Sequence, residues 1–369
     1  MKKKYIKFIL LISITYLSLA HGIAGKDIIS SLTLPPGFSI SLFCFGLGTP
    51  CMMTFDAKDN LILTVPMRGA VVALPDLDKD GKADNVVNLL LGIHFPSGID
   101  ISNDNIYIAA NNGIIKASYD PYSLKVTNIN IINSNLQGDR DKPVYRVLKC
   151  TQGRNILVSV IAPCDSCLPS NTKLGSILEY NGNGENEKIF ASGFLSVFGM
   201  AYSPGNLNLW AADSVKENMN EKEISEELNL IIPKKFYGWP YFYGDNVPNP
   251  SYKNQNLIKY AIKPQFKLPA RSSPYGLKFY SGNLFPEDCK GDLFIALHGK
   301  NRNRNGYKII QVIFSNNNPT KIRDFITGWI SPDVEIKGQP LDIAFNSKGE
   351  MFITDDYSGN VYKVIYKKP

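Results

Sequence analysis

The sequence lacks several features that define large classes of protein. It has no long apolar run after residue 20, so we expect no stable membrane insertion. Its charged residues, 20% of the total, form no block of like sign, so nucleic-acid binding is not indicated. Apolar residues rarely recur with helical spacing, whereas 29 glycines and 23 prolines are typical of a chain rich in turns. From these absences we expect a globular protein that is rich in turns.

The first 20 residues have the pattern of a secretory signal peptide. Four lysines precede an apolar run over 8–20, which is short for a membrane span, and the small residues Ser18 and Ala20 suit a signal peptidase. We therefore predict a signal peptide over 1–20, with cleavage as late as residue 24, and a secreted or periplasmic protein. No cysteine lies near this point, which argues against a lipid anchor. The four lysines belong to the formal net charge of +7, so about +3 remains for the mature chain.

A cysteine pair, Cys164 and Cys167, follows the apolar stretch at 156–161. A redox Cys-x-x-Cys normally begins a helix, and the residues after Cys167 have no helical pattern. A zinc site needs two more ligands, and none of the three histidines is nearby in the sequence. In an oxidising compartment the pair favours a local disulfide, with free thiols or a reactive role as alternatives.

The other four cysteines are less informative. Cys44 and Cys51 are near enough in sequence to close a second small loop. Cys150 and Cys289 have no partner that the sequence assigns.

One phrase recurs six times: an apolar strand, a turn of Gly, Asn or Asp, and a second apolar strand. The second strands begin near residues 61, 106, 156, 209, 293 and 351, so successive copies are about 45 to 84 residues apart. Most of these gaps are close to the period of four-stranded propeller blades. A single hairpin cannot bury both of its faces, so the copies must pack against one another. We predict an all-β fold, a six-bladed β-propeller.

The ends of the chain are expected to close the ring. The extended segments 38–45 and 360–366 are suitable partners in one terminal blade. Residues 25–369 then form a single propeller domain, with a long insertion over about 214–270 between the fourth and fifth copies. Insertions in repeat folds gather on one face, often the binding face.

Several phrases, each weak alone, together give a specific resemblance because of their shared order. They include LPPGFSI at 34–40, EELNLI at 226–231, YGWPYFYGD at 237–245, GDLFIALHG at 291–299 and GQPLDIAF at 338–345. By these motifs the chain resembles the soluble sugar dehydrogenases that depend on pyrroloquinoline quinone (PQQ), the glucose/L-sorbosone dehydrogenase group. The resemblance covers nearly the whole mature chain. The fold of that family is a six-bladed propeller, in agreement with the repeat count.

The resemblance implies PQQ and Ca²⁺ on the top face, a histidine as general base, and cationic side chains that hold the cofactor. A base must titrate near neutrality, and a cofactor with three carboxylates needs forked cationic donors. Several family positions are replaced here. The catalytic histidine aligns with Pro143, which cannot accept a proton, and the arginine of a G-R-P phrase aligns with Gln339. An Arg-Asn pair aligns with Leu195 and Ser196, and a further histidine with Ser97.

Other family positions are retained. By resemblance, the candidates for holding PQQ are Arg146, Glu227, Asn229 and Lys308. His298 is a weak candidate for the missing base, because it ends a strand and precedes a glycine, as suits the rim of a propeller cavity. A hydrogen-bonded structural histidine is the alternative. The family's metal-bearing loop uses backbone carbonyls, so residues 216–225 remain a candidate calcium loop.

An acidic turn near the N-terminus has the spacing of a calcium loop, with carboxylates at Asp76, Asp78, Asp80 and Asp84 and a glycine at Gly81. Position twelve of such a loop is Val87 rather than the usual glutamate. The turn therefore predicts either a structural calcium ion or a blade turn whose carboxylates cap backbone N–H groups.

Two functions compete. The first is PQQ-dependent oxidation of aldose sugars or sorbosone, with another residue serving as base. The second is a non-catalytic propeller that binds a glycan, peptide or protein on the same face, because the base and several cofactor-holding positions are replaced. A metal-dependent lactonase needs Glu, Asn and Asp from separate blades, and Glu227 and Asn229 come from one loop. The expected ligand is a sugar or other small molecule on the top face.

Overall fold

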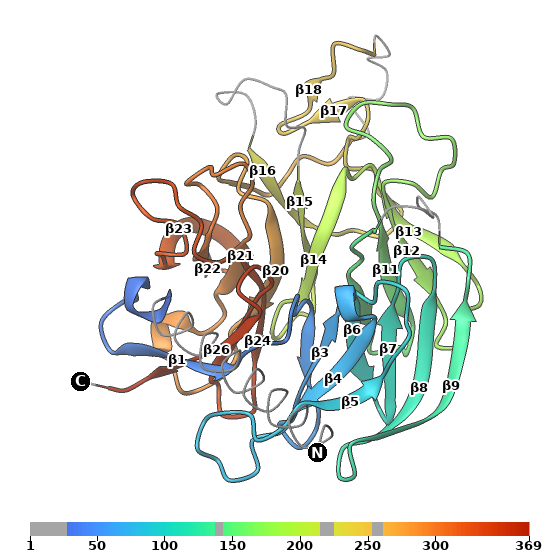
Figure 1. Cartoon of the computed structure of the whole chain (residues 1–369). Helices are drawn as coiled ribbons and strands as arrows, with labels where there is room; N and C mark the ends of the chain where they lie inside the picture. The colour runs from blue at the N-terminus through green and yellow to red at the C-terminus, as the bar shows by residue number, and fades with distance from the viewer. Residues whose placement is uncertain (1–27, 137–142, 215–224, 253–260, 369) are drawn as a thin grey trace, which may run out of the picture.

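The computed structural model describes residues 28–136, 143–214, 225–252 and 261–368. Within these ranges almost all regular structure is β, in six four-stranded antiparallel sheets that form the blades of a propeller (Figure 1). The predicted all-β, six-bladed β-propeller is confirmed. The predicted signal peptide lies outside the described residues.

The first three blades each contain consecutive strands. The first blade contains β2 (Met53–Phe55), β3 (Leu61–Val65), β4 (Ala70–Leu74) and β5 (Val87–Leu90). The second contains β6 (Gly98–Ser102), β7 (Asn105–Ala109), β8 (Ile114–Asp120) and β9 (Lys125–Asn133). The third contains β10 (Leu148–Cys150), β11 (Ile156–Val160), β12 (Ser176–Tyr180) and β13 (Lys188–Ser192).

The last three blades include one insertion and the ring closure. The fourth blade contains β14 (Ser196–Tyr202), β15 (Leu209–Ser214), β16 (Glu226–Leu230) and β19 (Phe266–Leu268), and a hairpin of β17 (Phe242–Tyr243) and β18 (Val247–Pro248) lies between its last two strands. The fifth contains β20 (Pro274–Phe279), β21 (Leu293–Leu297), β22 (Lys308–Ser315) and β23 (Asn318–Ile326). The sixth contains β24 (Pro340–Phe345), β25 (Met351–Asp355), β26 (Asn360–Tyr366) and β1 (Phe38–Cys44). Short helical turns occur at 28–31, η1 (Pro66–Arg68) and η3 (Glu287–Cys289).

The predicted repeat and its closure both match the structure. The second strands of the blades begin within one residue of the six predicted positions. The first strands contact one another in the cyclic order β2, β6, β10, β14, β20, β24 and back to β2, so they surround the axis. The N-terminal strand β1 pairs antiparallel with β26, from Phe38 opposite Tyr366 to Cys44 opposite Val361, and so completes the sixth blade.

The second strand of each blade contributes strongly to the core. Strands β3, β11, β21 and β25 are buried along their whole length. Each lies between two strands of its own sheet and between two neighbouring blades, so side chains on both faces are covered. This explains why these strands read as apolar runs such as LILTV and LFIAL rather than as alternating patterns. Burial of each large aliphatic side chain contributes about 1.5–3 kcal/mol.

Two glycines allow the first strands to approach closely around the axis. A Cβ atom on Gly199 of β14 would lie 1.9 Å from the carbonyl oxygen of Tyr275 on β20. A Cβ atom on Gly276 of β20 would lie 2.1 Å from Oδ1 of Asp342 on β24. Side chains at these positions would push the fourth, fifth and sixth blades apart.

The range 214–270, predicted as an insertion, contains parts of the blade itself. Strands β16 and β19 complete the fourth sheet, and the hairpin β17–β18 extends beyond it at the top of the view in Figure 1. The described residues contain no helix of the length and apolar character needed to cross a membrane.

Of the two disulfides suggested by the sequence, the structure contains one and not the other. Cys44 and Cys51 are free thiols. Cys44 ends the outermost strand of the sixth blade, whereas Cys51 precedes the innermost strand of the first blade, so the two occupy opposite radial positions. Cys164 and Cys167 are joined, as predicted.

Candidate functional site at the mouth of the axial channel

Polar residues gather where the first strand of each blade begins. The first and second strands of a blade are antiparallel, so the start of one adjoins the end of the other. In the sixth blade, for example, Pro340 is paired with Asp355. Residues just before the first strand and just after the second therefore meet at one end of the axis. Loops between strands carry binding residues in many folds for this reason.

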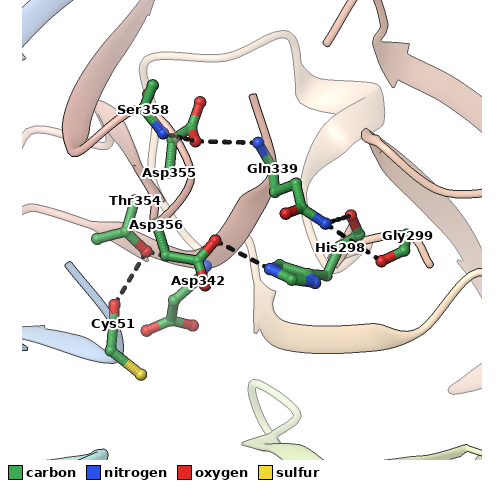
Figure 2. A network of polar contacts seen from close by, with 9 residues as sticks. All are labelled: Cys51, His298, Gly299, Gln339, Asp342, Thr354, Asp355, Asp356 and Ser358. Atoms are coloured by element: carbon green, nitrogen blue, oxygen red, sulfur yellow. Dashed lines mark hydrogen bonds and ion pairs between the residues drawn. The ribbon is translucent and has the colours of Figure 1, made fainter. Parts of the chain in front are cut away.

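His298 and Asp356 form the centre of this group. His298 directly follows β21 of the fifth blade and Asp356 directly follows β25 of the sixth. Nε2 of His298 lies 2.9 Å from Oδ1 of Asp356 (Figure 2), and the two side chains are only 16% and 14% exposed. The pair fixes the orientation of the imidazole and leaves Nδ1 as its second polar atom.

Backbone and amide groups hold the pair in place. The side-chain amide of Gln339 donates to the carbonyl oxygens of His298 and Gly299 at 3.5 and 3.4 Å (Figure 2). The backbone N–H of Gln339 donates to Oδ1 of Asp355 at 2.9 Å. Gln339 thus supports the loop of His298. By resemblance, the family carries an arginine at this position.

Aromatic rings form a floor beneath His298. The rings of Phe198 and Tyr275 are stacked, with centroids 4.4 Å apart and planes at 11°, and Tyr145 contacts both rings edge-on. The ring of Tyr275 lies 4.7 Å from that of His298. These residues come from the third, fourth and fifth blades and are partly exposed, so ring faces and edges line the mouth.

Burial raises the pKa values of several groups near the mouth. For the Tyr275 hydroxyl, burial is followed by the charge of Asp356, so this hydroxyl stays neutral. Burial also raises the pKa of the Cys51 thiol, so Cys51 is no nucleophile. Burial raises the pKa of Asp355 as well, although it accepts backbone hydrogen bonds from Gln339 and Ser358.

Arg146, a position retained from the family pattern, makes contacts that stabilise the fold. Its side chain is fully buried, Nε donates to the carbonyl of Asn111 at 2.9 Å, and Nη1 donates to that of Ser159 at 3.3 Å. Its backbone N–H donates to Oγ of Ser97 at 2.9 Å. Burial lowers the pKa of Arg146 to about 10, so it remains charged at neutral pH. Arg146 therefore joins the second and third blades through carbonyl groups.

Two further positions carried over from the family also lie away from His298. Nζ of Lys308 pairs with Oδ1 of Asp324 at 2.9 Å, and Asp324 is on β23, the outermost strand of the fifth blade. Pro143, at the position of the family's base, is exposed at the start of a described segment.

The cationic positions carried over from the family do not fit PQQ. A tricarboxylate needs cationic donors at its oxygens, yet Arg146 is bound to carbonyl groups and Lys308 to Asp324. Arg302 and Arg304, on the loop after His298, are exposed, and the Arg304 guanidinium donates to the carbonyl of Pro332. The group nearest the imidazole of His298 is instead a carboxylate.

A second polar cluster in the fourth blade fits calcium. Asp213 of β15 and Glu227 of β16 are opposite one another in the sheet and are 4% and 3% exposed. Oε1 of Glu227 accepts the N–H of Gly244 at 2.7 Å, and Oε2 accepts from the amide of Asn229 at 3.2 Å. Burial raises the pKa of Asp213, and burial together with the charge of Asp213 raises that of Glu227.

Two buried oxygen atoms beside this pair have no hydrogen-bond partner among the described residues. They are Oδ1 of Asn229 and Oγ of Ser214. Carboxylate, amide and hydroxyl oxygens are the ligands that Ca²⁺ prefers, and a cation would relieve the repulsion between the carboxylates. Glu227 and Asn229, predicted as cofactor-binding, thus form one cluster with Asp213. The candidate calcium loop 216–225 lies outside the described residues except for Ser225.

The aromatic segment 237–245 packs over this cluster. Tyr237 and Trp239 are buried, and the indole N–H of Trp239 donates to the carbonyl of Asp165 at 3.2 Å. Asp165 lies between the disulfide cysteines Cys164 and Cys167. The disulfide loop therefore supports the segment, which is a packed anchor rather than an open platform.

The acidic turn of the first blade brings three of its four carboxylates together. Oxygen atoms of Asp76, Asp78 and Asp84 lie within 4.8 Å of one another. Asp80 is instead 3.9 Å from Nζ of Lys82. The carboxylates also accept backbone N–H groups, as in the bond from Gly81 to Oδ2 of Asp76 at 3.2 Å. The turn thus shows both predicted features: its carboxylates accept backbone N–H groups, and three of them lie close together.

Sequence reasoning missed the partners that define both clusters. Asp356 follows Asp355 in an unremarkable Asp-Asp pair, and Asp213 ends the phrase WAAD. Tyr275 and Phe198 are aromatic residues in strands that have no distinctive motif around them. Only their position in the repeat could have identified these four residues. Each lies near the end of a strand at which the blades converge.

Comparisons with known proteins agree with this architecture. Residues 217–368 match the model of the TrAA12-like family. A protein of Borreliella burgdorferi, described as uncharacterized, is 27% identical over 389 residues, with all of both chains covered.

Solved structures share the fold. A calcium structure of the Trichoderma reesei carbohydrate-active enzyme of family AA12 has a TM-score of 0.76 at 18% identity, over 91% of this chain and 97% of that one. The PQQ domain of pyranose dehydrogenase from Coprinopsis cinerea, in its holo form, has a TM-score of 0.76 at 17% identity, over 90% and 97%. Together with the motifs and the six blades, these matches confirm the resemblance to the PQQ-dependent sugar dehydrogenase-like propellers.

Proposed function

We propose that this propeller binds a saccharide at the mouth of its axial channel and does not oxidise it with PQQ. The observation that carries the proposal is a carboxylate–imidazole pair beside aromatic rings, at a mouth where the retained cations Arg146 and Lys308 are bound to protein groups. Asp356 and Nδ1 of His298 supply polar groups for sugar hydroxyls, and the partly exposed ring of Tyr275 supplies a surface for apolar C–H groups. Tyr357, next to Asp356 in the chain, is 59% exposed and is a further aromatic residue that a saccharide could contact in this proposal.

Calcium has a structural role in this proposal. Asp213, Glu227 and Asn229 hold a Ca²⁺ ion that supports the aromatic segment 237–245, because Glu227 also accepts the N–H of Gly244. The acidic turn at Asp76 is a second, more exposed calcium site. Neither ion contacts the saccharide.

Export is part of the same proposal. The lysine-rich start and apolar run over 1–20 support a cleaved signal, and the disulfide Cys164–Cys167 supports an oxidising compartment. Mass spectrometry of the mature N-terminus tests this point, and an intact residue 1 in the exported fraction contradicts it.

The second candidate is PQQ-dependent oxidation of aldoses, as the names of the structural relatives suggest. The observation in its favour is the His298–Asp356 pair, a possible base at the end of the axis. The same preparation distinguishes the two functions. PQQ with CaCl₂ and a panel of neutral saccharides are titrated separately by calorimetry, followed by a dye-reduction assay with PQQ and aldoses.

Saccharide binding that weakens at least tenfold in Asp356→Asn and is unchanged in Tyr122→Ala supports the proposal. Tyr122 is a suitable control because it is 78% exposed in the second blade, between β8 and β9. Micromolar PQQ binding with turnover of an aldose refutes it in favour of the dehydrogenase.

A further inference from the structure

A small cavity lies on the axis among the first strands of the blades. It has a volume of about 20 Å³, and first-strand residues of all six blades line it or flank it. Its polar lining includes Lys149 of β10, Lys278 of β20 and Asp342 of β24. Asp342 is drawn in the polar network of His298 in Figure 2, whereas Lys149 and Lys278 belong neither to that network nor to the Asp213–Glu227 cluster. Neither proposed function uses the two lysines.

The two lysines have no protein partner in the described part of the chain. Neither ammonium group has a hydrogen bond or an ion pair there, although Lys149 and Lys278 are only partly exposed. A partly buried ammonium group either reaches water or pairs with an anion, because the loss of hydration is costly. Something other than the described side chains must therefore satisfy them.

The nearby carboxylates are held by backbone groups instead. Oδ2 of Asp342 accepts the N–H of Met53 at 2.8 Å, and Oδ2 of Asp100 accepts the N–H of Cys150 at 2.9 Å. Each carboxylate thereby ties a first strand to that of the next blade. The close approach at Gly276, described above, holds Asp342 in this position.

The electrostatics agree with the geometry that places both lysines on one cavity. The charge of Lys149, followed by burial, lowers the pKa of Lys278 to about 8, whereas Asp100 and Asp342 act in the opposite direction. The two lysines are thus close enough to repel each other.

We propose that a small inorganic anion of halide size binds between Lys149 and Lys278 in the axial channel. The small volume favours a ligand of atomic size, because a cavity needs roughly 10–15 Å³ to hold a single water molecule. Chloride or bromide fits this limit, whereas a sugar or PQQ does not. The bound anion links the third and fifth blades across the fourth and so stabilises the closed ring.

Thermal unfolding in different sodium salts at fixed ionic strength tests the site. Replacing gluconate by chloride raises the Tm of the wild-type protein by about 2 °C or more, with saturation at millimolar chloride. The increase is lost in Lys278→Met and in Lys149→Met. It remains in Lys321→Met, which removes an exposed lysine from β23.

Crystals grown with bromide give a test that does not depend on the folding of a variant. An anomalous peak between the two ammonium groups is expected. A chloride effect that persists in Lys278→Met, or a channel without an anomalous peak, contradicts the proposal and leaves water as the occupant. Either result is independent of saccharide binding at His298.

Discussion

His298 and Asp356 lie 2.9 Å apart across the boundary between the fifth and sixth blades. The two residues follow strands that are separated by about 60 positions in the chain, yet both strands end at the mouth of the channel. The contact therefore links neighbouring blades at the mouth of the channel, where we propose that a saccharide binds. Its position between two blades also gives it a structural role.

Removal of this contact is expected to destabilise the protein modestly. His298→Ala leaves the carboxylate of Asp356 without its imidazole partner, and a lost hydrogen bond of this kind costs about 1–2 kcal/mol. The free energy of unfolding in urea measures the cost. A double-mutant cycle with Asp356→Asn should give a coupling energy of about 0.5 kcal/mol or more. A coupling near zero would show that the two residues act independently.

Arg146 is expected to be a stability residue rather than a cofactor ligand. Arg146→Met removes the donors to the carbonyl groups of Asn111 and Ser159 and leaves them unsatisfied in a buried site. The expected loss is about 3 kcal/mol in the free energy of unfolding. Urea denaturation measures it. Arg146→Lys is the second variant to measure. A lysine keeps the positive charge but cannot donate to the carbonyl groups of Asn111 and Ser159 in two directions, as the guanidinium does.

An alternative role for Arg146 gives a different pattern. A cofactor-binding arginine would leave stability nearly unchanged on substitution and would abolish PQQ binding. Comparison of the urea midpoint with PQQ titration in the same Arg146→Lys preparation separates the two patterns.

The fold was accessible from the sequence because its signals are local and repeated. Each blade carries an apolar strand, a turn and a second apolar strand, and six copies of such a unit require mutual packing. The pairing of 38–45 with 360–366 followed from the need to close the ring. In contrast, the Cys44–Cys51 suggestion used only sequence distance, and the radial positions of β1 and β2 separate the two residues.

The site was accessible only in part. Motif phrases located His298, Glu227 and Asn229, but phrases do not state which neighbouring strand supplies the partner. Asp213 meets Glu227 through the antiparallel pairing of two strands in one blade, and Asp356 meets His298 because two blades converge. Neither neighbour can be read from the sequence. The role of Arg146 likewise depends on where its guanidinium points, which the sequence does not specify.

The acidic turn of the first blade should respond to calcium. Oxygen atoms of Asp76, Asp78 and Asp84 converge within 4.8 Å, so Ca²⁺ binding relieves repulsion among them. Because the site lacks a bidentate glutamate at its twelfth position and is largely exposed, we expect weak affinity, on the order of 10⁻⁴–10⁻³ M. Calorimetric titration of wild type and Asp78→Asn measures it. Asp104→Asn, an exposed acid at the β6–β7 turn, is the control, and an equal loss in both variants argues against a specific site.

The buried pair Asp213 and Glu227 should give the metal-free protein an unusual pH dependence. Both pKa values are raised by burial, so the folded apo protein binds more protons than the unfolded chain, whose carboxyl groups titrate near pH 4. Stability is then greatest at or below that pH and falls as the pH rises through the raised folded-state values. A loss of about 1–3 kcal/mol between pH 5 and 8 is expected in EDTA.

Calcium should reverse this trend, because the ion binds the charged carboxylates and is released when they are protonated. Thermal unfolding from pH 5 to 8, with EDTA or with CaCl₂, measures both curves. In Asp213→Asn the apo curve flattens, since one of the two interacting charges is absent, and the calcium effect at Glu227 weakens. In Asp104→Asn both curves keep the wild-type shape. If EDTA and CaCl₂ give parallel curves in the wild-type protein, then Asp213 and Glu227 hold no calcium, and the raised pKa values reflect a carboxyl pair that stays protonated.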